Sequence, residues 1–205
     1  MRKVKNQKCL SNISRKSMLA NKKRNIILLI AIVLTTVMLT TLFTVGSSIM
    51  KSIEISTTYQ VGTSSHAGFK FLTKEEYDEL ATDTHILDLS YNIIVGIPES
   101  EELNEEYTEI RYTEAESAKH SYSYPSHGKL PEKYHEVATC TTVLDAFGLP
   151  HEVGQTIHLK MSNGFTTYEG DFYVCGIWEK PASTVANQIY VSKDFQEEFS
   201  PTWKN

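Results

Sequence analysis

The sequence predicts an α+β protein anchored in a membrane, in which a single N-terminal transmembrane helix precedes an α+β domain outside the cytoplasm. The first observation behind this prediction is the distribution of charge along the 205 residues. Residues 1–25 carry nine bases and no acid, residues 26–50 carry no charge, and residues 51–205 have a net charge of −14. The second observation is that apolar residues in the last part change between helical and strand spacing. We therefore expect a basic cytoplasmic segment, a transmembrane helix and an acidic domain with these boundaries.

The apolar run over residues 26–50 reads IILLIAIVLTTVMLTTLFTVGSSIM. At about 1.5 Å per residue it reaches roughly 37 Å, enough to cross a hydrocarbon core of about 30 Å. A buried helix of a soluble protein rarely has so long a run without charge. A cleaved signal peptide has an apolar region of about 7–15 residues behind a short basic lead, and here both parts are longer. The run therefore predicts an uncleaved transmembrane helix.

Positive charge before the apolar run sets its predicted orientation. The positive-inside rule places the N-terminus in the cytoplasm and residues 51–205 on the other side of the plasma membrane. Leu10 and Ile13 alternate with bases, which predicts a short amphipathic helix on the inner leaflet; the alternative is a solvated basic tail that only sets the topology. Nucleic-acid binding is disfavoured because no nucleic-acid-binding motif accompanies the charge. The bases that we expect at the inner leaflet are Arg15, Lys16, Lys22, Lys23 and Arg24.

The first part of the acidic domain predicts a strand, a helix and a second strand. Residues 51–66 are expected to be a helix end that passes into a polar connector, and residues 69–71 are a short strand candidate. Thr73 is expected to begin a helix, because Glu76 three residues later completes a capping box. Apolar and polar residues then alternate over 87–95, which predicts the clearest strand of the chain.

The rest of the domain predicts further short elements. Gly96 and Pro98 are expected to end the strand before them, and the polar residues 114–129 are expected to form a loop. A short helix over 142–147 is expected to stop at Gly148 in the left-handed conformation. Further strands are expected at 107–113, 136–140, 156–161, 171–178 and 189–191, and a last helix from a Ser192 cap to Phe199.

The cysteines leave two interpretations open. Cys9 is expected to be cytoplasmic and reduced, whereas Cys140 and Cys175 both fall in predicted strands outside the cytoplasm. These two form a disulfide if their Cα atoms come within about 7 Å. Otherwise they are buried thiols that pack as small apolar side chains.

Sequence motifs do not predict a catalytic, metal or cofactor site in this chain. The pairs 135–136 and 151–152 each begin like a zinc-protease signature, but neither has a His three residues after its Glu. There is no phosphate-binding glycine loop and no Gly-x-Ser-x-Gly motif, so we expect neither an ATPase nor a hydrolase of those types. The acidic run is expected to be a solvated face, with a weak calcium site as the alternative; its residues are Glu101, Glu102, Glu105 and Glu106.

Two stretches together resemble a known family. Residues 13–46 are similar to the start of an FtsX/MacB-type ABC transporter permease, which has a basic amphipathic helix, an "NKKR" step and a Thr-containing first membrane helix. The outer domain of that family follows the pattern G-x-L-P, a short helix, V-G-x-x-[IV]-x-L, F-x-V-x-G-[IV] and IYVS. The matching segments here are residues 128–136, 142–149, 153–159, 172–177 and 189–192.

The resemblance implies a function without an enzyme activity in this chain. It implies a permease subunit, or its N-terminal part, because such permeases carry at least three further membrane helices after this domain. A separate cytoplasmic ATPase would hydrolyse ATP, and a second permease subunit or a second copy of the chain would be a further partner beside the lipid bilayer. Residues 51–205 would then be a MacB-like periplasmic core-type domain with a β-rich subdomain, acting on a peptide, lipid or envelope partner. The alternative is a single-pass anchored sensor or binding domain.

Overall fold

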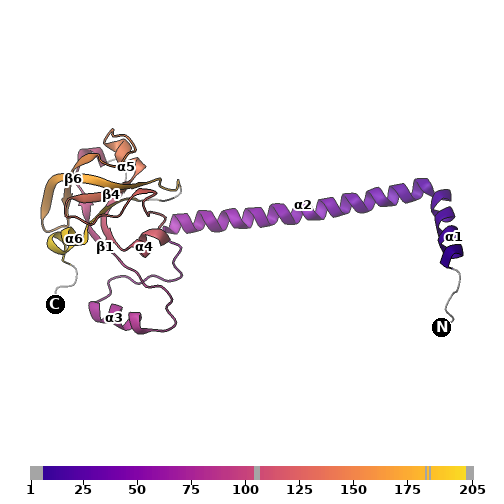
Figure 1. Ribbon diagram of the computed structural model, residues 1–205, viewed down its shortest axis with the longest axis horizontal. Coiled ribbons are helices and arrows are strands. Elements are labelled where there is room, and N and C mark those ends of the chain that lie inside the picture. Colours follow the sequence, from indigo (N-terminus) through magenta and orange to yellow (C-terminus); the bar gives the residue numbers. More distant parts are fainter. Residues whose placement is uncertain (1–6, 104–106, 183, 185, 202–205) are drawn as a thin grey trace. The chain divides into compact units, whose positions relative to one another are not determined.

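The computed structural model describes residues 7–103, 107–182, 184 and 186–201. The chain divides into two units, residues 1–54 and 55–205. It is a mixed α/β protein with one long apolar helix near the N-terminus and a β-rich domain (Figure 1). The predicted mixture of helix and strand is thus confirmed, together with an N-terminal helix apolar enough to cross a membrane.

Two helices occupy the N-terminal region. Helix α1 (Gln7–Ala20) shows that the described part of the basic lead is helical, and α2 (Lys22–Val61) contains the whole apolar run. As expected for residues 51–66, the helix continues past the apolar run and ends within this stretch, at Val61. The chain then turns at Gly62, whose φ of +80° lies in the left-handed region.

The threonines of the apolar run bond to their own helix. Thr36, Thr40 and Thr44 each donate a side-chain hydrogen bond to the carbonyl oxygen four residues earlier, at 2.8, 2.6 and 2.8 Å. Such bonds satisfy a hydroxyl where no water is present. No residue described in α2 is buried, so the helix is not a core helix of the part of the chain that the structure describes.

The β-rich domain is a closed barrel of six strands, which the sequence did not predict. Around the barrel the strands follow the order β6-β4-β7-β2-β1-β5, and β5 pairs with β6 to close it. The pairs β2–β7 and β4–β6 are parallel and the other pairs are antiparallel. The barrel strands are β1 (Asn92–Pro98), β2 (Thr108–Thr113), β4 (Glu136–Cys140), β5 (Thr156–Ser162), β6 (Thr167–Trp178) and β7 (Asn187–Val191).

Closure depends on the length of β6. The first half of its 12 residues forms a hairpin with β5, and the second half pairs with β4 on one side and with the short β3 (His127–Gly128) on the other. Gly176 allows the close approach of the chain before β4, because a Cβ there would collide with the backbone oxygen of Lys129. The core of the domain is formed by large, fully buried side chains from the strands and from helices α5 and α6, among them Ile110, Leu144, Ile157, Phe172, Ile189, Tyr190 and Phe195.

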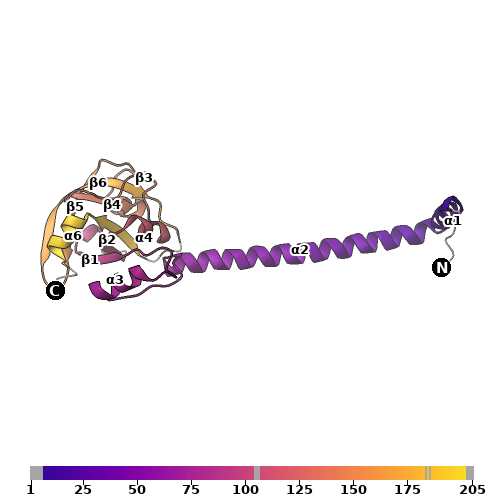
Figure 2. The same cartoon turned by 60° about the horizontal axis from the view of Figure 1, so that its bottom comes forward.

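Short helices surround the barrel, and their caps match the sequence prediction. Helix α3 (Lys74–Thr82) has the capping box between Thr73 and Glu76, and α6 (Lys193–Phe199) has its N-cap at Ser192. Helix α5 (Thr141–Ala146) is followed by Gly148 at a φ of +64°. A 3-10 turn (Glu101–Leu103) precedes β2, and α3 lies outside the barrel strands in both views (Figure 1, Figure 2).

Three predicted elements differ from the structure. Residues 69–71 are not a strand, and the strand predicted over 87–95 begins only at Asn92, where pairing with Thr113 starts. Gly96 does not end that strand but lies inside β1 at an irregularity of the β1–β2 ladder, where a Cβ would approach the Ser162 oxygen to 2.7 Å. The alternation of polar and apolar residues predicts which side chains can face a core. The first residue of a strand is set instead by where a partner strand is available for hydrogen bonding, which here is Thr113 opposite Asn92.

The polar stretch 114–129 is not only a loop. It contains α4 (Ala115–His120) and β3. Helix α4 buries Ser117 and Ala118 rather than large apolar residues, so its inward face gives no apolar periodicity in the sequence.

Candidate functional site: the junction between α2 and the barrel

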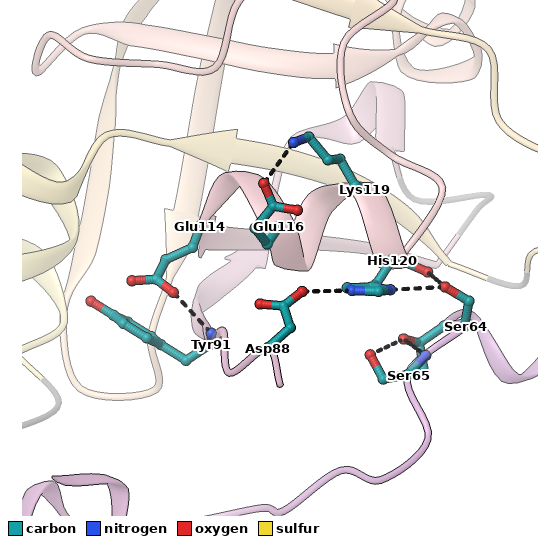
Figure 3. A network of polar contacts seen from close by, with 9 residues as sticks. Ser64, Ser65, Asp88, Tyr91, Glu114, Glu116, Lys119 and His120 are labelled. Atoms are coloured by element: carbon teal, nitrogen blue, oxygen red, sulfur yellow. Dashed lines mark hydrogen bonds and ion pairs between the residues drawn. The ribbon is translucent and has the colours of Figure 1, made fainter. Parts of the chain in front are cut away.

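His120 makes hydrogen bonds to two segments of the chain, the one that leaves α2 and the one that enters β1. The Ser64 N–H donates to the His120 carbonyl oxygen at 2.9 Å, and Ser64 Oγ lies 3.0 Å from His120 Nδ1. The opposite ring nitrogen, His120 Nε2, lies 3.0 Å from Asp88 Oδ2 (Figure 3). His120, the last residue of α4, therefore joins the segment that leaves α2 to the segment that enters β1.

Aromatic packing joins the last turns of α2 to the same place. Tyr59 packs edge to face against Tyr122, with ring centroids 4.6 Å apart. Tyr122 follows α4 and has a φ of 55°, in the left-handed region that a tyrosine rarely adopts. We call Tyr59, Ser64, Asp88, His120 and Tyr122 the junction.

The junction is connected to the barrel core by the residue after Tyr122. Ser123 is buried, donates its N–H to the Ala118 oxygen at 2.9 Å and forms a hydrogen bond through its hydroxyl with Tyr190 OH. Tyr190 also donates to Gln188 Oε1 at 2.6 Å, and burial raises the pKa of its phenol to about 12. Contacts therefore run without interruption from the end of α2 to a buried side chain of β7.

Ser64, His120 and Asp88 have the residue types of a nucleophilic triad, but the local backbone does not support acyl transfer. Such an enzyme needs N–H donors aimed at the developing oxyanion. The N–H of Ser64 is already bonded to His120, and the N–H of Ser65 donates to Thr63 Oγ1 at 3.1 Å. These two N–H groups are therefore occupied, and the three side chains hold two chain segments together.

An open cleft of about 540 Å³ lies on the N-terminal side of α4. Its lining residues are Leu89, Ser90, Tyr112, Thr113, Glu114, Ala115, Glu116, Leu130, Pro131, Glu132 and Lys193. Glu114 accepts a hydrogen bond from the Tyr91 N–H at 3.3 Å, and its own N–H donates to the Tyr91 oxygen at 3.2 Å. Glu116 and Glu132 form ion pairs with Lys119 and Lys129. Much of the charge in the cleft is thus balanced within the chain.

The structure places the predicted inner-leaflet bases on exposed helical positions. Arg15 and Lys16 lie on α1, and Lys22, Lys23 and Arg24 begin α2. All five side chains are exposed. Their contact with lipid stays a prediction.

Cys140 and Cys175 are both buried, and both are free thiols in the structure. The Cys140 Sγ lies 3.7 Å from Asn187 Oδ1, and the Cys175 Sγ lies 3.4 Å from the Lys129 oxygen. Cys140 is paired across the β4–β6 ladder with Trp178, three residues beyond Cys175. The disulfide is therefore not formed, and burial raises the pKa of the Cys175 thiol to about 11.

The described residues contain no group of three His, Cys, Asp or Glu side chains placed to hold a metal ion. His151 of the second His-Glu pair bonds to Asp145 at 2.7 Å, and Glu136 of the first accepts the N–H groups of Glu132 and Lys133. Within the acidic run, Glu105 and Glu106 lie outside the described residues.

The sequence analysis missed the junction. Its polar members are separated by 56 residues between Ser64 and His120 and by 32 between Asp88 and His120, so no local spacing connects them. No family model matches this chain, and no curated protein matches it. The similarity to FtsX/MacB-type permeases therefore rests on the sequence motifs alone.

Proposed function

We propose that this chain is a permease subunit, or the N-terminal part of one, of an FtsX/MacB-type ABC transporter. The apolar residues 26–50 cross the plasma membrane, the N-terminus is cytoplasmic, and the barrel lies outside the cytoplasm. The observation that carries the proposal is the continuity of α2: one helix contains both the apolar run and Tyr59, which packs against the barrel at the junction.

In this proposal the chain transmits movement and performs no chemistry. A separate cytoplasmic ATPase hydrolyses ATP and shifts the membrane helices between two arrangements, together with a second permease subunit or a second copy of this chain. Helix α2 contains no proline between its apolar part and residues 55–61, and in this proposal the displacement passes along the helix. The junction then passes this displacement to the barrel through Tyr122, Ser123 and Tyr190.

A single-pass sensor or binding domain is the second candidate. The observation that favours it is the open cleft beside α4, whose lining combines Leu89, Tyr112 and Leu130 with carboxylates. In that case binding of a ligand in the cleft changes the contacts at the junction, because α4 lines the cleft at its N-terminal end and contributes His120 to the junction.

Co-purification with an ATPase separates the two candidates. The full gene product, tagged and extracted from its native membrane, is expected to retain an ATPase with a Gly-x-x-x-x-Gly-Lys-Ser/Thr loop. Reversal of the three bases Lys22, Lys23 and Arg24 to Glu is expected to weaken this association or disturb the orientation, because positive charge holds the helix end at the cytoplasmic face.

Lys160→Glu, on the exposed face of the barrel, is the matched charge-reversal control and is expected to leave the association intact. Sequencing of the source DNA past codon 205 gives an independent readout: further apolar spans of about 20 residues beside an ATPase gene support the permease. A wild-type preparation without any ATPase, from a gene with neither feature, would favour the anchored binding domain.

A further inference from the structure

Residues 65–87 form a lobe whose two ends are tied to one residue. Ser64 and Asp88, which flank the lobe, both bond to His120. The lobe contains α3, which buries none of its residues. Tyr77 of α3 makes an edge-to-face contact with Tyr91, with ring centroids 5.5 Å apart. The lobe is thus a folded excursion outside the barrel (Figure 2).

Large apolar side chains of the lobe face solvent. Phe69 is 61% exposed, and Phe71 and Leu87 are each 99% exposed. Phe71 also has a φ of 60°, a left-handed conformation that is rare for a bulky residue. The Phe71 ring is almost fully in water, so packing within the lobe does not offset the strain of this backbone conformation. Backbone strain of this kind is found most often at functional positions.

The chemistry of this segment matches the interface of a lipid bilayer. Phe69 and Phe71 flank Lys70, and the side chains of all three are exposed. Phenylalanine is among the apolar side chains that interfacial segments bury at the boundary between headgroups and hydrocarbon, and a lysine can bury its stem there while its ammonium group stays in water. Phe165, at a hairpin turn, is also almost fully exposed. It has neither a second phenylalanine nor a lysine beside it in the sequence, and single exposed apolar residues are common on protein surfaces.

The covalent path makes the bilayer reachable. The apolar run ends at Met50, and the eleven further residues to Val61 rise about 16 Å as a helix. The interfacial layer extends about 5–7 Å beyond the hydrocarbon on each side. Ser64 is held at His120, so the free length is the five residues that follow it as far as Phe69, and these span up to roughly 17 Å when extended, more than the roughly 10 Å that remain.

We propose that Phe69 and Phe71 insert into the outer interfacial layer of the membrane that α2 crosses, with Lys70 among the headgroups. This inference rests on the proposed membrane-spanning role of α2. Through the junction, the inserted lobe gives the barrel a second attachment to the bilayer. His120 then links the movement of α2, the lobe and the barrel.

Site-directed spin labelling of the full chain tests the insertion. Cys9→Ser removes the exposed thiol, and Cys140 and Cys175 are buried, so a nitroxide can be placed at Lys70→Cys alone. The protein is reconstituted into vesicles of phosphatidylcholine and phosphatidylglycerol. Accessibility to oxygen, which concentrates in lipid, is compared with accessibility to a water-soluble nickel chelate. The expected oxygen-to-nickel ratio at position 70 is several-fold above that of a label at Phe165→Cys.

Two further labels and a variant make the outcomes distinguishable. A label at Leu39→Cys reports the membrane placement of α2 itself: a water-like ratio there removes the spanning role and the lobe insertion with it. A lipid-like ratio at 39 with a water-like ratio at 70 overturns only the lobe insertion. Protection of position 70 from both reagents indicates a protein cover, such as a second copy of the chain, and also overturns it.

The causal residues are tested in the same system. The double variant Phe69→Ser and Phe71→Ser is expected to lower the oxygen-to-nickel ratio at position 70 to the level of the Phe165 label. Phe71 is almost fully exposed, so its replacement removes little packing within the chain. Phe165→Ser is the matched control and is expected to leave the ratio unchanged; an unchanged ratio in the double variant contradicts the insertion.

Discussion

At the scale of single residues, His120 is the most informative side chain. It ends α4, accepts the Ser64 N–H on its carbonyl oxygen and uses both ring nitrogens for Ser64 and Asp88. Its side chain is 37% exposed, so these bonds compete with water and each contributes modestly. Their importance is positional, because they join two segments that are far apart in the sequence.

His120→Ala is expected to lower the free energy of unfolding by about 1 kcal/mol, because two side-chain hydrogen bonds are lost at a partly solvated site. Thermal unfolding of the full chain in detergent or vesicles measures this loss. His66→Ala, at an exposed position of the same connecting segment, is the control and is expected to change stability by less than about 0.5 kcal/mol. Equal changes in the free energy of unfolding for the two substitutions would show that the hydrogen bonds of the His120 ring do not stabilise the fold.

At the scale of elements, the register of β4 against β6 decides the state of the cysteines. The ladder pairs Cys140 with Trp178 and leaves Cys175 at the irregularity between the Val137 and Ala138 pairs. A strand rises about 3.3 Å per residue, so three residues along β6 take Cys175 beyond the reach of Cys140. Strand membership alone, which the sequence predicts, does not determine this register.

Alkylation measures the state of the three thiols. At pH 7 only Cys9 is expected to react in the folded chain, because Cys140 and Cys175 are buried and the raised pKa of Cys175 leaves it protonated below about pH 10. After denaturation without reductant, all three are expected to react. A mass that shows one alkyl group and a loss of two hydrogens would instead reveal the disulfide.

Some elements of the fold can be predicted from the sequence, and others depend on contacts between distant segments. Strand β5 and the caps at Thr73 and Ser192 follow from local patterns, because a helix cap or an alternating run is decided within a few residues. The closed barrel was not predicted, since its closure depends on parallel pairing of β2 with β7 and on the long β6. The junction was missed for the same reason: its bonds join segments that only the completed barrel brings together.

At the scale of the whole molecule, the division of charge agrees with the division of structure. The described basic residues from Lys8 to Arg24 and the uncharged run belong to α1 and α2, whereas most of the acidic part forms the barrel and its helices. Helix α2 is long and apolar enough to cross a membrane, and none of its described residues is buried within the chain. The proposed membrane around α2 gives these apolar side chains a suitable environment, and the threonine hydroxyls bonded within the helix are compatible with it.

Thiol labelling of intact cells tests the central claim most directly, namely that α2 crosses the membrane with the barrel outside the cytoplasm. A membrane-impermeant maleimide is expected to leave the native chain unlabelled, because the proposed topology places Cys9 in the cytoplasm and the other two thiols are buried. It is expected to label the variant Phe165→Cys, whose position is 96% exposed on the barrel. Labelling of Cys9 in intact cells, protection of position 165 until the membrane is permeabilised, or a mature chain that lacks Cys9 would each contradict the account.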